Sequence, residues 1–155
     1  MSLSIDLDVE ELTKKKFSKP VSDIFKKVAR TTFEYIKTNS KNVAGNYGSP
    51  VLTGRFYTSH KVSLNSIDRS VSPKNPAGSK RPYNPLPMST VDNVLSGWKL
   101  GDTLYIANSL GYARKIEYEG ASWAKTPEGV YRVSVEAVKN RFKGGISDVA
   151  FTIGS

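Results

Sequence analysis

The stretch PVSDIFKKVARTTFEYIKTNS, residues 20–40, has the clearest secondary-structure pattern in the chain. Its apolar residues recur every three or four positions, the spacing of one helix face; they are Val21, Ile24, Phe25, Val28, Ala29, Phe33 and Ile36. Pro20 suits the first turn of a helix, where its missing N–H leaves no hydrogen bond unmade. We therefore predict an amphipathic helix over about residues 20–40, with a solvated face that carries the lysines.

Short alternating or β-branched segments flank this helix and predict strands. Residues 103–108, TLYIAN, are typical of a strand, and residues 149–153 alternate in the manner of an edge strand. Residues 4–12 also alternate, although so short a segment could instead begin a helix. Residues 51–57 predict a short turn or helix that leads into a strand through Val62, Leu64 and Ile67.

A second helix is expected near the C-terminus. Thr126, Pro127 and Glu128 form a helix-start pattern of N-cap, first-turn proline and first-turn acid. An apolar face would follow, and Gly144-Gly145 would end the helix; the face comprises Val130, Val133, Ala137, Val138 and Phe142. Residues 112–118 are compatible with one short helical turn, and the pattern of residues 91–98 is ambiguous.

Residues 68–90 hold five prolines and Gly78, which predicts a long irregular loop. A loop of this length usually has a task, such as reaching a neighbouring subunit. The 155 residues fit one domain. We predict a single α+β domain in which a long N-terminal helix and a C-terminal helix pack on a small, mostly antiparallel β-sheet. Residues 1–19 would form an N-terminal arm.

The chain is basic, with a net charge of +9, and the excess is concentrated in residues 14–41. A basic surface favours an anionic partner but does not choose between nucleic acid and protein. The absence of cysteine excludes disulfides and thiolate metal sites. We find no apolar run long enough for a membrane span and no secretory-signal pattern, so we expect no membrane partner and assembly in the cytoplasm.

Few residues suggest catalysis. His60 is the only histidine, and a lone histidine in a polar stretch predicts a surface residue. Glu117, Glu119 and Asp102 are the best paired carboxylates, and we expect them to be surface or interface salt-bridge partners. No phosphate-binding or dinucleotide motif is present, and we expect neither a metal nor a cofactor. A small hydrolase that uses His60 or Glu117 stays a minor alternative.

Two blocks of sequence resemble the neck and tail-completion family of long-tailed bacteriophages, a family of tail components. One is the Pro-x-x-Thr-Gly-Arg segment of residues 50–55, with Thr53, Gly54 and Arg55. The other lies within residues 103–135 and matches at Asn108, Tyr112, Ala113, Glu117, Tyr118, Gly120, Ser122, Pro127, Gly129, Arg132 and Val133. Both blocks occur in the order that the family has.

The resemblance implies a structural virion protein rather than an enzyme. Copies of the chain would form a ring at the head–tail joint, next to head-closure and tail-terminator or tail-tube proteins, and would leave a channel for DNA. Identical subunits close such a ring through head-to-tail interfaces. The serious rival is a basic protein that binds nucleic acid without reading its sequence.

The same residues allow a physical interpretation. Thr53 and Gly54 would make a turn, and Arg55 would then pair with Glu117. Tyr112, Tyr118 and Trp123 are large amphipathic groups of the kind enriched at protein–protein contacts, although each could instead belong to the core. Further interface candidates are Lys80, Arg81 and Tyr83 in the proline-rich loop.

Overall fold

The computed structural model describes residues 1–7, 21–44, 55–73, 86–119, 128–143 and 148–154. In chain order its elements are β1 (Ser2–Leu7), α2 (Val21–Ala44), α3 (Arg55–Thr58), β2 (Lys61–Leu64), α4 (Ser89–Leu95), β3 (Leu104–Ala107), the π-helical turn η2 (Lys115–Glu119), α5 (Tyr131–Arg141) and β4 (Val149–Gly154). The predicted α+β class is confirmed.

The strands form one antiparallel sheet in the order β2-β3-β1-β4. Strand β1 lies inside the sheet and pairs with β3 on one side and with β4 on the other. The alternation of residues 4–12 therefore marks a strand as far as Leu7, and residues 8–19 lie outside the described part. Strand β4 is an edge strand, as its sequence predicted.

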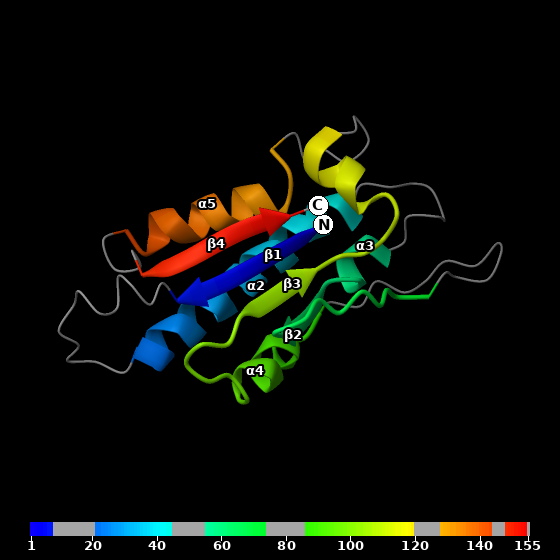
Figure 1. Cartoon of the computed structure of the whole chain (residues 1–155). Helices are drawn as coiled ribbons and strands as arrows, with labels where there is room; N and C mark the ends of the chain where they lie inside the picture. Colours follow the sequence, from blue (N-terminus) through cyan, green and yellow to red (C-terminus); the bar gives the residue numbers. More distant parts are fainter. Residues whose placement is uncertain (8–20, 45–54, 74–85, 120–127, 144–147, 155) are drawn as a thin grey trace.

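The helices α2 and α5 lie on the same side of the sheet, behind it in Figure 1. Alternation in β1 follows from this arrangement: Leu3, Ile5 and Leu7 are buried beneath the helices, and Ser4 and Asp6 between them are partly exposed. Strand β3 buries Leu104 and Ile106 in the same layer. The opposite face of the sheet carries mainly small or polar side chains, such as Ser2, Ser4 and Thr152, together with the larger Lys61 and Tyr105.

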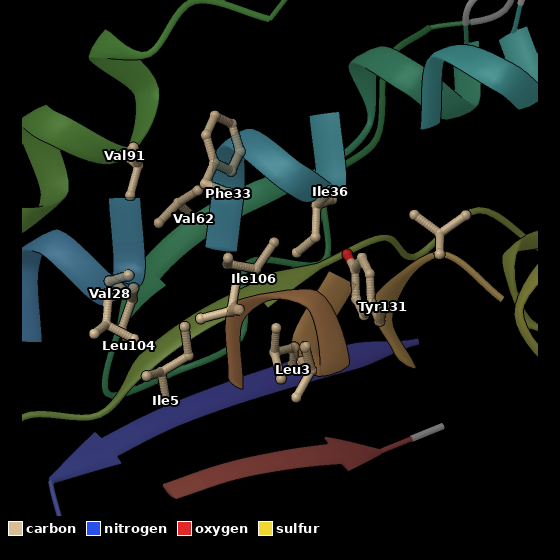
Figure 2. Packing of buried hydrophobic residues seen from close by; sticks show 14 of the residues in the cluster. Leu3, Ile5, Val28, Phe33, Ile36, Val62, Val91, Leu104, Ile106 and Tyr131 are labelled. Atoms are coloured by element: carbon tan, nitrogen blue, oxygen red, sulfur yellow. The ribbon is translucent and has the colours of Figure 1, made fainter. Parts of the chain in front are cut away.

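The hydrophobic core lies between the sheet and α2 (Figure 2). Helix α2 buries Phe25, Val28, Phe33 and Ile36, which recur at helical spacing. The Phe25 ring stacks on Trp98 with 4.3 Å between centroids. Burying each such apolar side chain stabilises the fold by about 1.5–3 kcal/mol, so this face positions α2 against the sheet.

The predicted start of the C-terminal helix is wrong. Helix α5 begins at Tyr131, after a turn at residues 128–130, and Thr126 and Pro127 lie outside the described part. Its buried face also differs, because Val133 and Ala137 are only half-buried. The buried residues of α5 are Tyr131, Ser134, Val135 and Val138. The predicted stop at Gly144-Gly145 is not described; the helix ends at Arg141.

The remaining segments correct several boundaries. The ambiguous residues 91–98 contribute to α4, which begins at Ser89 and so takes the last two residues of the predicted 68–90 loop. Pro87 precedes that helix, and its carbonyl accepts from the Thr90 amide. Residues 68–73 form no helix or strand, and residues 74–85 are not described. Strand β2 ends at Leu64, before Ile67.

Candidate functional site

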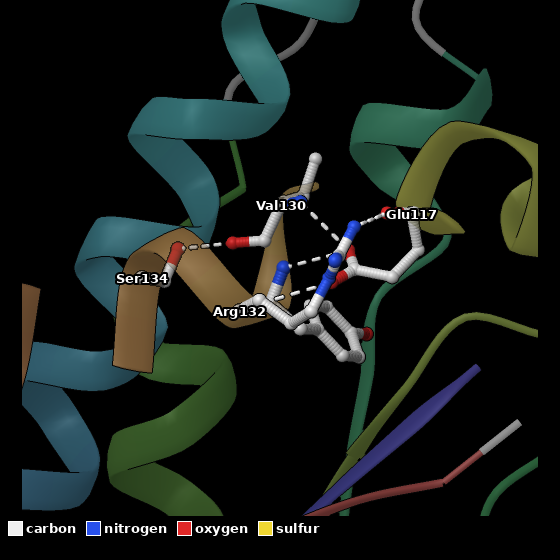
Figure 3. A network of polar contacts seen from close by, with 5 residues as sticks. Glu117, Val130, Arg132 and Ser134 are labelled. Atoms are coloured by element: carbon white, nitrogen blue, oxygen red, sulfur yellow. Dashed lines mark hydrogen bonds and ion pairs between the residues drawn. The ribbon is translucent and has the colours of Figure 1, made fainter. Parts of the chain in front are cut away.

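Glu117 is the centre of a polar junction between η2 and the start of α5 (Figure 3). Its side chain has no exposed surface. The carboxylate accepts hydrogen bonds from the backbone amides of Val130 at 2.6 Å, Tyr131 at 2.8 Å and Arg132 at 2.9 Å. The Arg132 guanidinium adds an ion pair at 3.2 Å and also donates to the carbonyl of Glu117.

This arrangement is a helix N-cap supplied from a distant part of the sequence. The first amides of a helix have no partner within the helix, and the helix dipole favours a negative charge beside them. The local N-cap position is Val130, whose side chain cannot accept a hydrogen bond. Glu117 takes over that role, and the amides and guanidinium compensate its buried charge.

Gly129 makes the close approach possible. Its φ of +78° is a backbone conformation that residues with a β-carbon resist. A β-carbon at this position would lie 2.5 Å from Oε1 of Glu117 and 2.8 Å from its carbonyl oxygen. The backbone before α5 therefore reaches the carboxylate only because residue 129 is glycine.

The predicted pairing of Glu117 with Arg55 is wrong. Arg55, at the start of α3, donates instead to the carbonyl of Ser72 at 2.8 Å. Glu117 pairs with Arg132, which sits in the helix turn that the carboxylate caps and is therefore already beside it. The expectation of a surface carboxylate is also wrong for Glu117, and the structure does not bring Asp102 to it. Asp102 bonds to Asn65 and to the Lys99 amide in the turn before β3.

His60 is buried, with 1% of its surface exposed, so the predicted surface position is wrong. Its Nε2 lies 2.7 Å from the Ser40 hydroxyl and its Nδ1 lies 2.9 Å from the Tyr131 hydroxyl. The Ser40 hydroxyl donates to the Ile36 carbonyl, so it accepts from His60. We assign the ring proton to Nε2, and Nδ1 then accepts from Tyr131.

The two polar groups form one connected network through Tyr131. The Tyr131 amide bonds to Glu117, and its hydroxyl bonds to His60. Burial, together with the charge of Glu117, raises the pKa of Tyr131 well above its usual value. Burial lowers the pKa of His60 to about 3, so the ring is neutral at pH 7. Both imidazole nitrogens are engaged inside the protein, which suits an anchoring role.

The buried imidazole predicts loss of stability in acid. The folded state holds the pKa of His60 near 3, below its ordinary 6.5. Unfolded chains therefore bind an extra proton as the pH falls from 6.5 towards 3, and the free energy of unfolding decreases by up to about 1.4 kcal/mol per pH unit. We expect this residue to make the free energy of unfolding in urea about 2.5 kcal/mol lower at pH 4.5 than at pH 7.0.

His60→Gln is the matched variant, because it keeps a donor and an acceptor but does not titrate. We expect it to be less stable at pH 7 and to lose less stability between pH 7.0 and 4.5. An equal loss in both proteins would show that His60 does not stay neutral in the folded state.

Asn108, at the end of β3, joins three segments. Its side chain donates to the Phe56 carbonyl at 3.0 Å and accepts from the Leu110 amide at 3.2 Å. Its own amide donates to the carbonyl of Met1 at 3.0 Å. The side chain is fully buried, so these bonds fix α3 against the end of the sheet.

Ala113 is buried in the core cluster, and Tyr112 packs on that cluster while half-buried. The Tyr112 hydroxyl is shielded from solvent and has no hydrogen-bond partner within the described part of the chain. Burial raises its pKa, and the nearby charge of Arg55 opposes that shift. Tyr112 thus belongs partly to the core, in line with one of its two predicted roles.

Tyr118 is the exposed member of the junction, with 40% of its surface accessible. The guanidinium of Arg132 lies 5.1 Å from its ring centroid, and that of Arg114 lies 5.6 Å from it. Arg114 is exposed. We call these three residues the Arg-Tyr surface, because they present cationic and aromatic groups together.

A second basic feature lies between α2 and α4. A shallow pocket there is lined by Lys26, Lys27, Arg30, Asp92, Leu95 and Ser96. Arg30 pairs with Asp92 at 3.0 Å, so one of the three cations is already neutralised.

Several predicted site residues lie outside the described part of the chain. They are Thr53, Gly54, Lys80, Arg81, Tyr83, Gly120, Ser122, Trp123 and Pro127. Among the residues that are described, no group of three acids or histidines is placed to hold a metal ion. No helix in the same ranges is long and apolar enough to cross a membrane.

Comparison of the chain with protein-family models, with curated proteins and with solved structures finds no match.

Proposed function

We propose that this chain is a structural subunit of the neck of a tailed bacteriophage. Copies of it form a ring at the head–tail joint, contact head-closure and tail-terminator or tail-tube proteins, and leave a channel for DNA. The virion is its final location, after assembly in the host cytoplasm.

The observation that carries the proposal is the role of the residues behind the sequence resemblance. Asn108 ties β3 to α3, and Glu117 with Gly129 and Arg132 locks η2 to α5. These contacts hold the elements in place, and they satisfy the hydrogen-bonding groups of Asn108 and Glu117 inside the protein. Function has to be inferred from the roles of specific residues, because the fold alone does not indicate it. The structural roles of these residues support a protein that works through its shape and its contacts.

The Arg-Tyr surface supports an assembly role for the exposed side of the same junction. Tyrosine and arginine are the side chains most enriched at energetically important protein contacts. Glu117 holds Arg132, so the surface is organised before a partner arrives. We further propose that α2, α5 and the sheet form the rigid body. The proline-rich loop predicted for residues 68–90, which ends before α4 at Ser89, would reach adjacent subunits.

Electron microscopy of purified virions of the source phage tests the proposal. We expect a symmetric ring at the head–tail joint whose subunit density fits this fold. Virions that lack the chain would overturn the neck proposal.

A substitution in the Arg-Tyr surface gives a functional test. Tyr118→Ala should reduce incorporation of the subunit into virions by about 10- to 30-fold, the effect of losing roughly 2 kcal/mol at a contact residue. The side chain is partly exposed and does not belong to the hydrophobic core, so the melting temperature should change little. Leu100→Ala is the control, because Leu100 is 69% exposed and stands outside this surface. Equal incorporation of both variants would remove Tyr118 from the interface.

Binding to nucleic acid is the second candidate, and the basic pocket between α2 and α4 favours it. Lys26 and Lys27 have no ion pair among the described contacts. Phosphate contacts release counterions, so the logarithm of DNA affinity would fall steeply with the logarithm of salt concentration. Lys27→Glu should reduce that slope if this pocket meets phosphates, and the fold should be unaffected. A steep slope together with absence from virions would place this candidate first.

A further inference from the structure

Within the described residues, the outer edge of β4 lacks the features that normally prevent an edge strand from pairing. Its six residues, VAFTIG, contain no charge and no proline, although the chain has 23 lysines and arginines. Edge strands of soluble proteins are usually protected by such residues or by a covering segment. The other edge is partly protected: Ser63 of β2 bonds to residues 66 and 68, which fold back over it.

The hydrogen-bond pattern determines which groups of β4 are unpaired. The carbonyl of Met1 accepts from Asn108 on the β3 side, so every second residue of β1 from Met1 faces β3. The residues between them face β4, and the register assigns their partners. The β4 residues bonded to β1 are Ala150, Thr152 and Gly154. The residues whose N–H and C=O point to the open side are Val149, Phe151 and Ile153.

We infer that the β4 edge pairs with the β4 edge of a second copy of this chain about a two-fold axis at Phe151. Such pairing is antiparallel by symmetry. It places Phe151 opposite its own equivalent and Val149 opposite Ile153, with about six inter-chain hydrogen bonds.

The match of the two edges selects a second copy as the partner. All three outward-bonding residues are apolar, and their side chains share the face of the sheet that α2 and α5 cover. Phe151 and Ile153 are only partly buried in the single chain. Pairing two such rows covers both and brings like apolar groups together. The exposed side chains on the other face, Ala150 and Thr152, are small and uncharged and so create no repulsion.

The inference goes beyond the proposed function and is tested separately. Light scattering after size exclusion, on the full chain, should give the mass of two chains. A wild-type protein that stays monomeric at the highest soluble concentration would overturn the inference. A larger ring without β4–β4 contact would also overturn it and would leave the neck proposal standing.

Two proline substitutions separate pairing from folding. Ile153→Pro removes an N–H that points to the open side, so the protein should fold and become monomeric. Thr152→Pro removes an N–H bonded to β1 and should lower the melting temperature strongly. An Ile153→Pro protein that is folded and still dimeric would contradict the inference.

A disulfide test remains decisive if Ile153→Pro fails to fold. The chain has no native cysteine. Phe151→Cys would place two cysteines opposite each other across the axis, with α-carbons about 5.5 Å apart, a distance that a disulfide can span. We expect oxidation to link most chains into covalent dimers. Leu100→Cys, at an exposed site away from β4, is the control and should stay largely unlinked. Equal yields from both variants would overturn the inference.

Discussion

Replacing Glu117 with alanine is expected to lower the free energy of unfolding by about 3–5 kcal/mol. The substitution leaves the amides of Val130, Tyr131 and Arg132 without an acceptor in a buried place, and it leaves the Arg132 guanidinium without its counter-ion. Urea unfolding followed by circular dichroism measures the change.

Two further variants separate the causes of this loss. Glu128→Ala removes a nearby exposed carboxylate and should change stability by less than about 0.5 kcal/mol. Glu117→Gln keeps the shape but not the charge, so it should fall between wild type and Glu117→Ala. If Glu117→Ala is as stable as Glu128→Ala, the carboxylate does not cap α5.

Gly129→Ala should be the second severe substitution, with a loss of about 2–4 kcal/mol. The left-handed backbone accounts for about 1–2 kcal/mol of it. The rest comes from the added methyl group, which would lie 2.5 Å from Oε1 of Glu117 and must displace it from the amides. Chemical unfolding at pH 7 tests this prediction.

Gly101→Ala is a matched control for Gly129→Ala. Gly101 also has a positive φ, +99°, but its added methyl group would meet nothing within 4 Å. It should therefore lose only the conformational part, about 1 kcal/mol. Equal losses at the two positions would mean that contact with Glu117 adds nothing.

The two severe substitutions should also be non-additive. In a Glu117→Ala background, Gly129→Ala no longer meets the carboxylate, although the Glu117 carbonyl oxygen remains 2.8 Å from the new β-carbon. The further loss in the free energy of unfolding that Gly129→Ala causes in this background should be smaller than in the wild type but not zero. A double-mutant cycle measures this coupling directly.

Elements with a strong local pattern were predictable from sequence. The apolar spacing in residues 20–40 identifies the residues that α2 buries, and the alternation in β1 and β4 matches their faces in the sheet. The start of α5 was not predictable in this way. Thr126 and Pro127 form a local start pattern, but a helix can begin where a distant group caps it, and here that group is Glu117.

The environment of the single histidine was also not predictable from the local sequence. The residues around His60 are polar and predict exposure, yet Ser40 and Tyr131 lie 20 and 71 positions away and satisfy both ring nitrogens. Burial of a polar group depends on its hydrogen-bond partners, and local composition carries no information about partners so distant.

Sequence alone therefore determined the class of the fold, the buried face of α2 and the alternating faces of β1 and β4, because periodicity is a local property of the chain. Tertiary structure alone decided the partner of Glu117, the state of His60 and the start of α5. Each depends on atoms from separate segments meeting in a dry interior, where an unpaired polar group is too costly to keep.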